Sequence, residues 1–223
     1  MYYVSDYDKV LGEVIVKLKE LDINFSKSYN DGRINSIFNE EKIVKILLNI
    51  QNEINILKEY DVKIYEQPKP RFWYDIVIKN TDNSFFLPLN IKITNPNLKS
   101  ASNISSKTGL YFALTGDINP NFSNTWGNYF YKLAKNLKAT QTDYYLLVFN
   151  KNSPKDIFFT SLKRMQSLIP NGNNLPFQFN PNLNRKLVNR TYAQSKEFLL
   201  NILFQSVKKR AKILDDFNDN FKN

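Results

Sequence analysis

The sequence has 223 residues, 42% of them hydrophobic, enough for one sizeable core, so we expect a single domain over residues 1–223. It contains no Cys and no His, which excludes Cys/His zinc sites and catalysis by thiol or His groups. No run of 18 apolar residues is present and the N-terminus is acidic, so we expect neither a membrane span nor a signal peptide, and we expect a cytoplasmic protein. Lys and Arg number 31 against 21 acids, a net charge of +10 that suits a polyanion such as DNA, although proteins that bind no nucleic acid also reach this balance.

Two amphipathic helices are predicted in the first quarter of the chain. From Asp6 to Asp22 apolar residues recur every three or four positions, at Val10, Val14, Leu18 and Leu21. A second helix should begin at Asn39 as N-cap and continue to about residue 57. Glu40 and Glu41 would fall in its first turn, where the helix dipole favours acids. That explains both acids without catalysis, but Glu40 also shares the buried stripe and is a candidate site residue.

The next part of the sequence predicts a β-hairpin. Residues 71–79 are rich in aromatic and β-branched side chains, which is typical of a strand. Residues 80–83, Asn-Thr-Asp-Asn, are typical of a turn because Asn and Asp tolerate positive φ. The return strand, residues 84–94, is apolar except at Asn90 and Lys92.

These two polar residues share a sheet face with an acid of the first strand. Residues two apart in a strand point to the same side, so Asn90 and Lys92 project together. With the turn centred between residues 82 and 83, Asp75 lies directly opposite Asn90, with Cβ atoms about 5 Å apart. A slip of one residue in register would scatter the group. An ion pair between Asp75 and Lys92 is the alternative, purely structural explanation.

This segment resembles the PD-(D/E)XK nucleases, most nearly type II restriction endonucleases of the EcoRV kind. The similarity rests on the run Pro70-Arg-Phe-Trp-Tyr-Asp75, followed by Asn90-Ile91-Lys92 on the next strand. It extends over roughly residues 34–115 and includes a helix with an acid at Glu40 and a proline-rich lead-in at residues 66–70. The resemblance implies an α/β (α+β) fold like that of restriction endonucleases, with a mixed central sheet flanked by helices.

The resemblance also implies roles for the residues of this group. Asp75, Asn90 and the Ile91 carbonyl would hold Mg²⁺, a hard cation that prefers oxygen ligands and keeps several waters. Lys92 would orient or deprotonate the attacking water and stabilise the charge that develops on the phosphate. Glu40, or Glu41 in its place, would act as an outer acid.

Position 90 departs from the family pattern. Most relatives have Asp or Glu there, whereas the Asn90 amide offers one neutral oxygen and no charge, so metal affinity should be lower. Some PD-(D/E)XK enzymes carry Asn or Gln at this position and remain active. A natural active site and an engineered loss of activity therefore both fit this residue.

The remaining elements complete a mixed pattern of helices and strands. Besides a first strand at residues 62–66, we expect a polar loop at 95–106, a buried helix or strand at 108–115, a helix at 126–137, a central strand at 142–150 and another strand at 156–161. Lys99 and Lys107, in and beside the polar loop, are candidates for contacts with the phosphate backbone. A mobile surface loop without function is the alternative.

The C-terminal quarter carries the candidate base-reading residues. Asn and Gln read adenine edges, so we predict that residues of the 171–180 loop contact bases, namely Asn171, Asn173, Asn174 and Gln178. Arg185, Lys186 and Arg190 would then contact phosphates. Ordinary turn chemistry in an Asn-rich chain is the alternative. A last helix is expected over about residues 194–217, with a basic cluster at 208–212, and residues 215–223 are expected to fray.

These predictions lead to three functional hypotheses. The first is a type II restriction endonuclease, a homodimer that hydrolyses phosphodiester bonds of double-stranded DNA with Mg²⁺. Its first and last helices (about residues 6–22 and 191–217) are candidates for dimer or DNA contacts. The second, which Asn90 favours, is a DNA-binding protein without catalysis on the same scaffold. The third is a structure-specific nuclease such as a junction resolvase.

Overall fold

The computed structural model describes residues 2–25, 32–95, 101–123 and 125–221, with side chains of the second range from residue 37 onwards. The chain divides into two compact units. Unit 1 comprises residues 1–95 and 141–161, and unit 2 comprises residues 96–140 and 162–223. A single domain over residues 1–223 stays a prediction.

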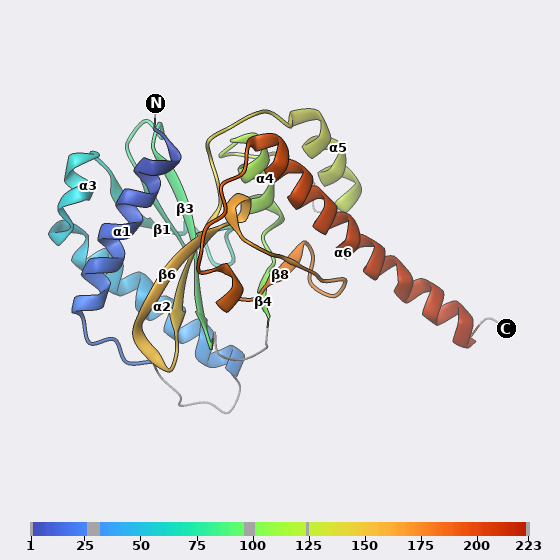
Figure 1. The fold of residues 1–223 in the computed structure, drawn as a ribbon, viewed down its shortest axis with the longest axis horizontal. Coiled ribbons are helices and arrows are strands. Elements are labelled where there is room, and N and C mark those ends of the chain that lie inside the picture. Colours follow the sequence, from blue (N-terminus) through green and yellow to red (C-terminus); the bar gives the residue numbers. More distant parts are fainter. Residues whose placement is uncertain (1, 26–31, 96–100, 124, 222–223) are drawn as a thin grey trace. The chain divides into compact units, whose positions relative to one another are not determined.

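Unit 1 contains a five-stranded mixed sheet, which confirms the predicted mixed α/β class. Its strands lie in the order β1 (Lys63–Glu66), β2 (Ile76–Lys79), β3 (Phe86–Thr94), β5 (Tyr145–Asn150) and β6 (Ser153–Ser161). β1, β3 and β6 are labelled in Figure 1. β3 and β5 run parallel, and the other neighbours are antiparallel. β5 is buried along its whole length between β3 and β6, so the prediction of a central strand there is confirmed.

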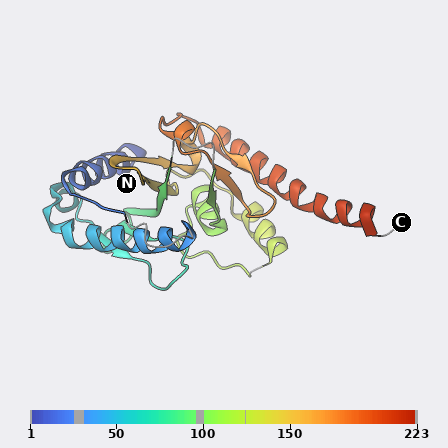
Figure 2. The same cartoon turned by 90° about the horizontal axis from the view of Figure 1, so that it is seen from below.

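Helices cover one face of this sheet. They are α1 (Val4–Glu20), α2 (Gly32–Ile50) and α3 (Asn55–Glu59), with a 3₁₀ turn, η1 (Gln51–Glu53), between the last two; Figure 2 shows α1 and α2 along the sheet. One apolar cluster joins them to the strands, with Val10, Leu18, Ile43, Leu47, Ile76, Leu89 and Ile91 among its buried members. The apolar period of α1 thus packs as the sequence predicts.

The second helix differs from its prediction at both ends. α2 begins at Gly32, so Asn39 is not its N-cap but lies buried inside the helix. It ends at Ile50, where η1 follows, and the Gln51 side chain accepts a hydrogen bond from the backbone N–H of Ile64 in β1, at 3.1 Å. An Asn followed by two acids is a common helix start, yet here the same residues form a helix interior.

The hairpin has a shorter first arm than predicted. β2 begins only at Ile76, since Arg71 adopts a left-handed φ of 62° and follows a proline-rich bend. The predicted turn at residues 80–83 is confirmed. Asn83 has a φ of 57°, and the Asn80 side-chain oxygen accepts a hydrogen bond from the Phe85 N–H at 3.0 Å.

Unit 2 combines helices with a small antiparallel sheet. The helical elements are α4 (Lys107–Thr115), α5 (Trp126–Asn136), η2 (Leu162–Arg164), η3 (Asn182–Asn184) and α6 (Tyr192–Phe221). The sheet has the order β4 (Ser102–Ile104), β8 (Phe177–Phe179) and β7 (Ile169–Pro170). The segment predicted as a polar loop therefore contains a strand, whose three residues are too few to give an apolar period.

The last helix is longer than predicted. α6 continues to Phe221, so the prediction of a frayed tail is wrong for residues 215–221. Leu199 and Leu203 of its apolar stripe are buried, but Leu214 and Phe217 are 62% and 51% exposed. The outer part of α6 extends beyond the other elements of unit 2 (Figures 1 and 2).

Candidate active site

The hairpin register brings Asp75 and Asn90 together. The β2–β3 ladder pairs Ile76 with Leu89, so the next pair outward would be Asp75 with Asn90. The Asp75 backbone N–H donates to the Leu89 carbonyl at 2.9 Å, one residue away from this register, so regular pairing ends at Ile76 and Asp75 lies directly beyond it. The predicted register is confirmed.

Asp75, Asn90 and Lys92, here called the polar patch, gather where β2 begins beside β3: Asn90 and Lys92 lie on the sheet face opposite the core, and Asp75 directly precedes β2. Side chains alternate between the two faces along a strand. The neighbouring residues of opposite parity, all fully buried in the core cluster, are Ile76, Leu89 and Ile91. The three residues of the polar patch are half-buried, so each combines partial desolvation with access from solvent.

A loop before β2 holds Asp75 in place. The Gln67 backbone N–H donates to the Asp75 carbonyl at 3.0 Å, and the Gln67 side-chain oxygen accepts from the Phe72 N–H at 3.1 Å. The Tyr144 hydroxyl donates to the Trp73 carbonyl at 2.6 Å, which ties the loop to the start of β5. Gln67 and Tyr144 are positioning residues that the sequence does not predict, because nothing in their local pattern marks these tertiary contacts.

The backbone of β3 fixes one oxygen of the Asp75 carboxylate. Its Oδ2 accepts a hydrogen bond from the Ile91 N–H at 2.6 Å. Burial raises the pKa of the Asp75 carboxyl, whereas this hydrogen bond and the positive charge of Lys92 lower it, and the effect of burial is the largest. The charged form of Asp75 is therefore unfavourable in this partly buried position, and a bound cation would stabilise it.

Asn90 and Lys92 have no side-chain partner in the described part of the chain. Their side chains make no hydrogen bond there, and the ion pairs with N–O distances up to 4.0 Å among described residues lie elsewhere. The alternative of an Asp75–Lys92 ion pair is thus not formed, and Lys92 acts on Asp75 through its charge at longer range. Because they have no partner among the described residues, the half-buried Asn90 amide and Lys92 ammonium are available to bind a ligand.

The oxygen donors of the polar patch fit a hard divalent cation that keeps much of its water. Asp75 Oδ1 accepts no hydrogen bond from the described residues, and the Asn90 amide oxygen is equally unengaged. Within the described ranges, no three side chains of the Asp, Glu, His or Cys type gather to hold a metal ion. A cation at the polar patch would therefore have few protein charges and depend on water and phosphate oxygens.

The two candidate outer acids come from α2. Glu40 is half-buried and Glu41 is exposed, while Ile43 and Leu47, further along the helix, are fully buried. Because α2 begins at Gly32, neither acid lies in its first turn, and the expected stabilisation by the helix dipole is wrong. α2 packs on the core face of the sheet, opposite the polar patch.

In the loop of unit 2 that is predicted to read bases, the first Asn makes hydrogen bonds within the loop itself. Asn171 is buried, and its Oδ1 accepts hydrogen bonds from the backbone N–H groups of Asn173 at 3.0 Å and Asn174 at 3.3 Å. Gly172 lies so close to α6 that an added Cβ would be 2.9 Å from the Arg210 backbone nitrogen. The alternative of turn chemistry accounts for Asn171, and close packing against α6 accounts for Gly172.

The other residues of this loop and its flank differ in exposure. Asn173, Asn174 and Lys186 are exposed, whereas Gln178 and Arg185 are half-buried. The Gln178 side-chain nitrogen donates to the Asn103 side-chain oxygen at 2.8 Å, and the Asn171 side-chain nitrogen donates to the same oxygen at 3.2 Å. Base contacts by Asn173 and Asn174 stay a prediction.

The remaining basic candidates are engaged or lie outside the described residues. Lys107 Nζ lies 5.4 Å from the ring centroid of Phe122 and 5.6 Å from that of Trp126, so its ammonium rests on aromatic faces. The Arg190 guanidinium donates to the carbonyl of Met165 at 2.7 Å, which makes it a packing residue. Lys99 lies outside the described residues.

Comparison with known proteins found no related family. No protein-family model matches the chain, and no curated protein matches its sequence. Among the described residues, no helix combines the length and the apolar character needed to cross a membrane.

Proposed function

We propose that the protein hydrolyses phosphodiester bonds of double-stranded DNA with Mg²⁺, as a type II restriction endonuclease. The observation that carries this proposal is the polar patch, in which the Asp75 carboxylate accepts from the Ile91 N–H, between Asn90 and Lys92, and is influenced by the charge of Lys92. The side chains of Asn90 and Lys92 have no partner within the described residues, and such groups favour a ligand. The polar patch also follows the order of residues in the PD-(D/E)XK motif that the sequence resembles.

Each residue of the polar patch has a role in this reaction. Asp75 and Asn90 would hold the cation through their oxygens, with the Ile91 carbonyl as a further ligand. When bound, Mg²⁺ supplies positive charge at the scissile phosphate and lowers the pKa of a water molecule. The Lys92 ammonium would orient the attacking water and donate hydrogen bonds to the phosphate oxygens as their charge develops. The Ile91 N–H keeps one Asp75 oxygen fixed throughout.

The charge of the chain supports DNA as substrate. A net charge of +10 attracts the phosphate backbone over distances comparable to the Debye length. In unit 2, the exposed side chains of Asn173, Asn174 and Lys186 are the candidates for direct contacts. Lys107 and Asn171 are weaker candidates, because aromatic rings and backbone N–H groups already engage them.

A homodimer is part of this proposal, and α6 supports it. Beyond Arg210, whose guanidinium donates to the Gly172 carbonyl at 2.7 Å, the helix exposes Leu214, Phe217 and Phe221 by 62%, 51% and 74%. These three recur at helical spacing on one stripe. Basic residues at 208–212 precede acids at 215–219, so antiparallel pairing of two copies would bring opposite charges together.

Light scattering tests this pairing. Phe217→Glu should convert the dimer to a monomer, because it places a charge in the centre of the shared apolar stripe. Phe204→Glu is the matched control, since Phe204 is 64% exposed on the same helix but off the stripe. Equal molar masses for both variants and the wild-type chain would contradict the proposed surface.

Plasmid cleavage tests the proposed activity. Incubation of the wild-type chain with plasmid DNA and Mg²⁺ should give discrete fragments that disappear with chelator and in Lys92→Ala. Asn90→Asp, which restores the acid of the motif, should cleave faster. DNA that stays intact with both the wild-type chain and Asn90→Asp, under any divalent metal, would refute the activity.

A DNA-binding protein without catalysis is the second candidate. The observation that favours it is the amide at Asn90, which leaves the polar patch with Asp75 as its carboxylate. Gel-shift binding that survives chelation, without cleavage by any variant, would select it over the nuclease. Preference for branched over linear DNA would instead indicate a structure-specific nuclease.

A further inference from the structure

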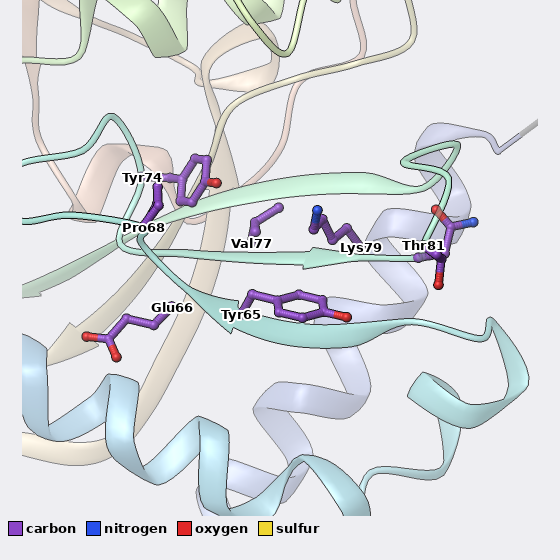
Figure 3. Close-up of a pocket in the computed structure, with 8 residues that line it drawn as sticks. Tyr65, Glu66, Pro68, Tyr74, Val77, Lys79 and Thr81 are labelled. Atoms are coloured by element: carbon purple, nitrogen blue, oxygen red, sulfur yellow. The ribbon is translucent and has the colours of Figure 1, made fainter.

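A pocket of about 380 Å³ opens beside the polar patch on unit 1. Its lining includes residues of β1, β2, the lead-in loop and the hairpin turn, drawn in Figure 3, namely Tyr65, Pro68, Tyr74, Val77, Lys79 and Thr81. The register pairs Tyr65 with Val77 and Val77 with Pro88, so Tyr65, Val77 and Lys79 lie on the same sheet face as Asn90 and Lys92. The pocket and the polar patch are thus neighbours on one surface.

Aromatic and apolar side chains form the walls and floor of this pocket. Tyr65 is 42% exposed on the edge strand β1, while Tyr74 is 8% and Val77 1% exposed. Figure 3 shows the two tyrosine rings on either side of Val77. An aromatic ring left this open on a strand is a ready surface for stacking.

One positive charge faces the pocket. Lys79 Nζ donates to the Asn83 side-chain oxygen at 2.9 Å and lies 5.4 Å from the ring centroid of Tyr65. Glu66 also lines the pocket, but in Figure 3 its carboxylate points away from the other labelled side chains. The pocket therefore joins an exposed ring to an ammonium group that already contacts that ring and Asn83, so a ligand has to replace one of these contacts.

This chemistry matches a nucleobase with its phosphate. Bases stack on aromatic side chains in a sequence-tolerant way, and Lys pairs with the adjacent phosphate. Val77 lies two residues from Asp75, which is about 7 Å along the strand. At that distance the pocket is within reach of a nucleotide close to the one whose phosphate lies at Asp75.

We propose that this pocket binds one unstacked base of the DNA strand whose phosphate lies at the polar patch. The position of that phosphate rests on the proposed function, whereas base binding by Tyr65 does not. The preferred DNA consequently contains an unpaired base near the site of cleavage. In a fully paired duplex, a base has to leave the stack before it can fill the pocket, and the duplex then loses the stacking energy of that base.

Binding of 2-aminopurine DNA without divalent metal tests the pocket directly. One duplex carries the fluorescent base in a single-nucleotide bulge, and the other carries it fully paired. The wild-type chain should bind the bulged duplex about tenfold more tightly, as expected for one stacked base. Tyr65→Leu should remove this preference, and Tyr65→Phe should keep it. Lys79→Gln should weaken binding of the bulged duplex without abolishing the preference.

Tyr131→Leu is the matched control, because Tyr131 is 62% exposed on α5 in the other unit. It should bind both duplexes as the wild-type chain does. Equal affinity of the wild-type chain for the two duplexes, or an unchanged preference in Tyr65→Leu, would overturn the proposal.

This binding assay, combined with the plasmid cleavage assay, separates this proposal from the proposed activity. A preference for the bulged duplex that depends on Tyr65, in a chain that cleaves no DNA, would support the pocket and refute the nuclease. Metal-dependent cleavage that depends on Lys92, without any preference for the unpaired base, would support the nuclease and refute the pocket.

Discussion

The polar patch of unit 1 and the 171–174 loop of unit 2 are both rich in polar side chains, yet they use them in opposite ways. In the loop, Asn171 is buried and its Oδ1 accepts two backbone N–H groups. In the polar patch, Asn90 and Lys92 are half-buried, and their side chains have no partner among the described residues. The same amide thus closes a turn in one place and stays available in the other.

This difference indicates which of the two regions is available to bind a ligand. A polar side chain that satisfies its own backbone contributes to stability, and its removal leaves unpaired donors. A polar side chain held without a partner contributes little to stability, and the folded chain keeps it for another reason. Mutations should therefore change stability in the loop and activity in the polar patch.

Lys92→Ala should have the largest effect on activity. We expect the rate of DNA cleavage to fall by at least about 100-fold, as for the loss of a group that stabilises transition-state charge. Stability should hardly change, because Lys92 has no ion pair to lose within the described residues. Lys63→Ala, an exposed lysine of β1, is the control for charge and should cleave normally. Equal rates for the two variants would remove Lys92 from the site.

Asn171→Ala should have the largest effect on stability. Its loss leaves the N–H groups of Asn173 and Asn174 without their acceptor, so the free energy of unfolding should fall by about 1–3 kcal/mol. Asn173→Ala, at an exposed position, should change it by less than about 0.5 kcal/mol. Urea unfolding measures both. A stable Asn171→Ala with impaired DNA binding would mean that this Asn reads bases after all.

Asp75→Asn should make stability less dependent on pH. Burial raises the pKa of Asp75, so the folded chain holds this proton more tightly than the unfolded chain does. Its contribution to stability is present below the ordinary pKa of about 3.9 and is lost as the pH rises through the raised value. The neutral variant should therefore be more stable than the wild-type chain at pH 8, with the difference shrinking towards pH 4. A variant that is less stable at pH 8 would contradict this.

Lys186→Ala should have the smallest effect. If the exposed Lys186 contacts one phosphate, its removal should weaken binding of all DNA sequences alike and reduce the slope of log affinity against log salt by about 0.9. Lys107→Ala should change the slope less, because that ammonium lies over the rings of Phe122 and Trp126. Equal slopes for both variants and the wild-type chain would exclude Lys186 as a phosphate contact.

The sequence predicted the hairpin register because two local signals agreed. Turn residues at 80–83 set the centre of the hairpin, and the polar interruptions at Asn90 and Lys92 set its face. The ladder pairs Ile76 with Leu89, which is the predicted register. Local patterns of this kind are readable because they depend on neighbours in the chain.

Features that depend on distant contacts were not predictable. Gln51, directly after the end of α2, binds the backbone of β1, and β4 is held by its pairing with β8. The loop that holds Asp75 depends on Gln67 and Tyr144, which carry no signal in the sequence. The exposure of the Tyr65 ring likewise depends on the position of β1 at the sheet edge, which no local pattern of the sequence indicates.

Metal binding tests the central claim, that the polar patch holds a divalent cation, most directly. Mn²⁺, which shares the preference of Mg²⁺ for oxygen ligands, is followed by electron paramagnetic resonance of the free ion. We predict weak binding by the wild-type chain, tighter binding by Asn90→Asp because of the added charge, and no binding at this site in Asp75→Asn. Equal Mn²⁺ binding by all three chains, or none by Asn90→Asp, would contradict the claim.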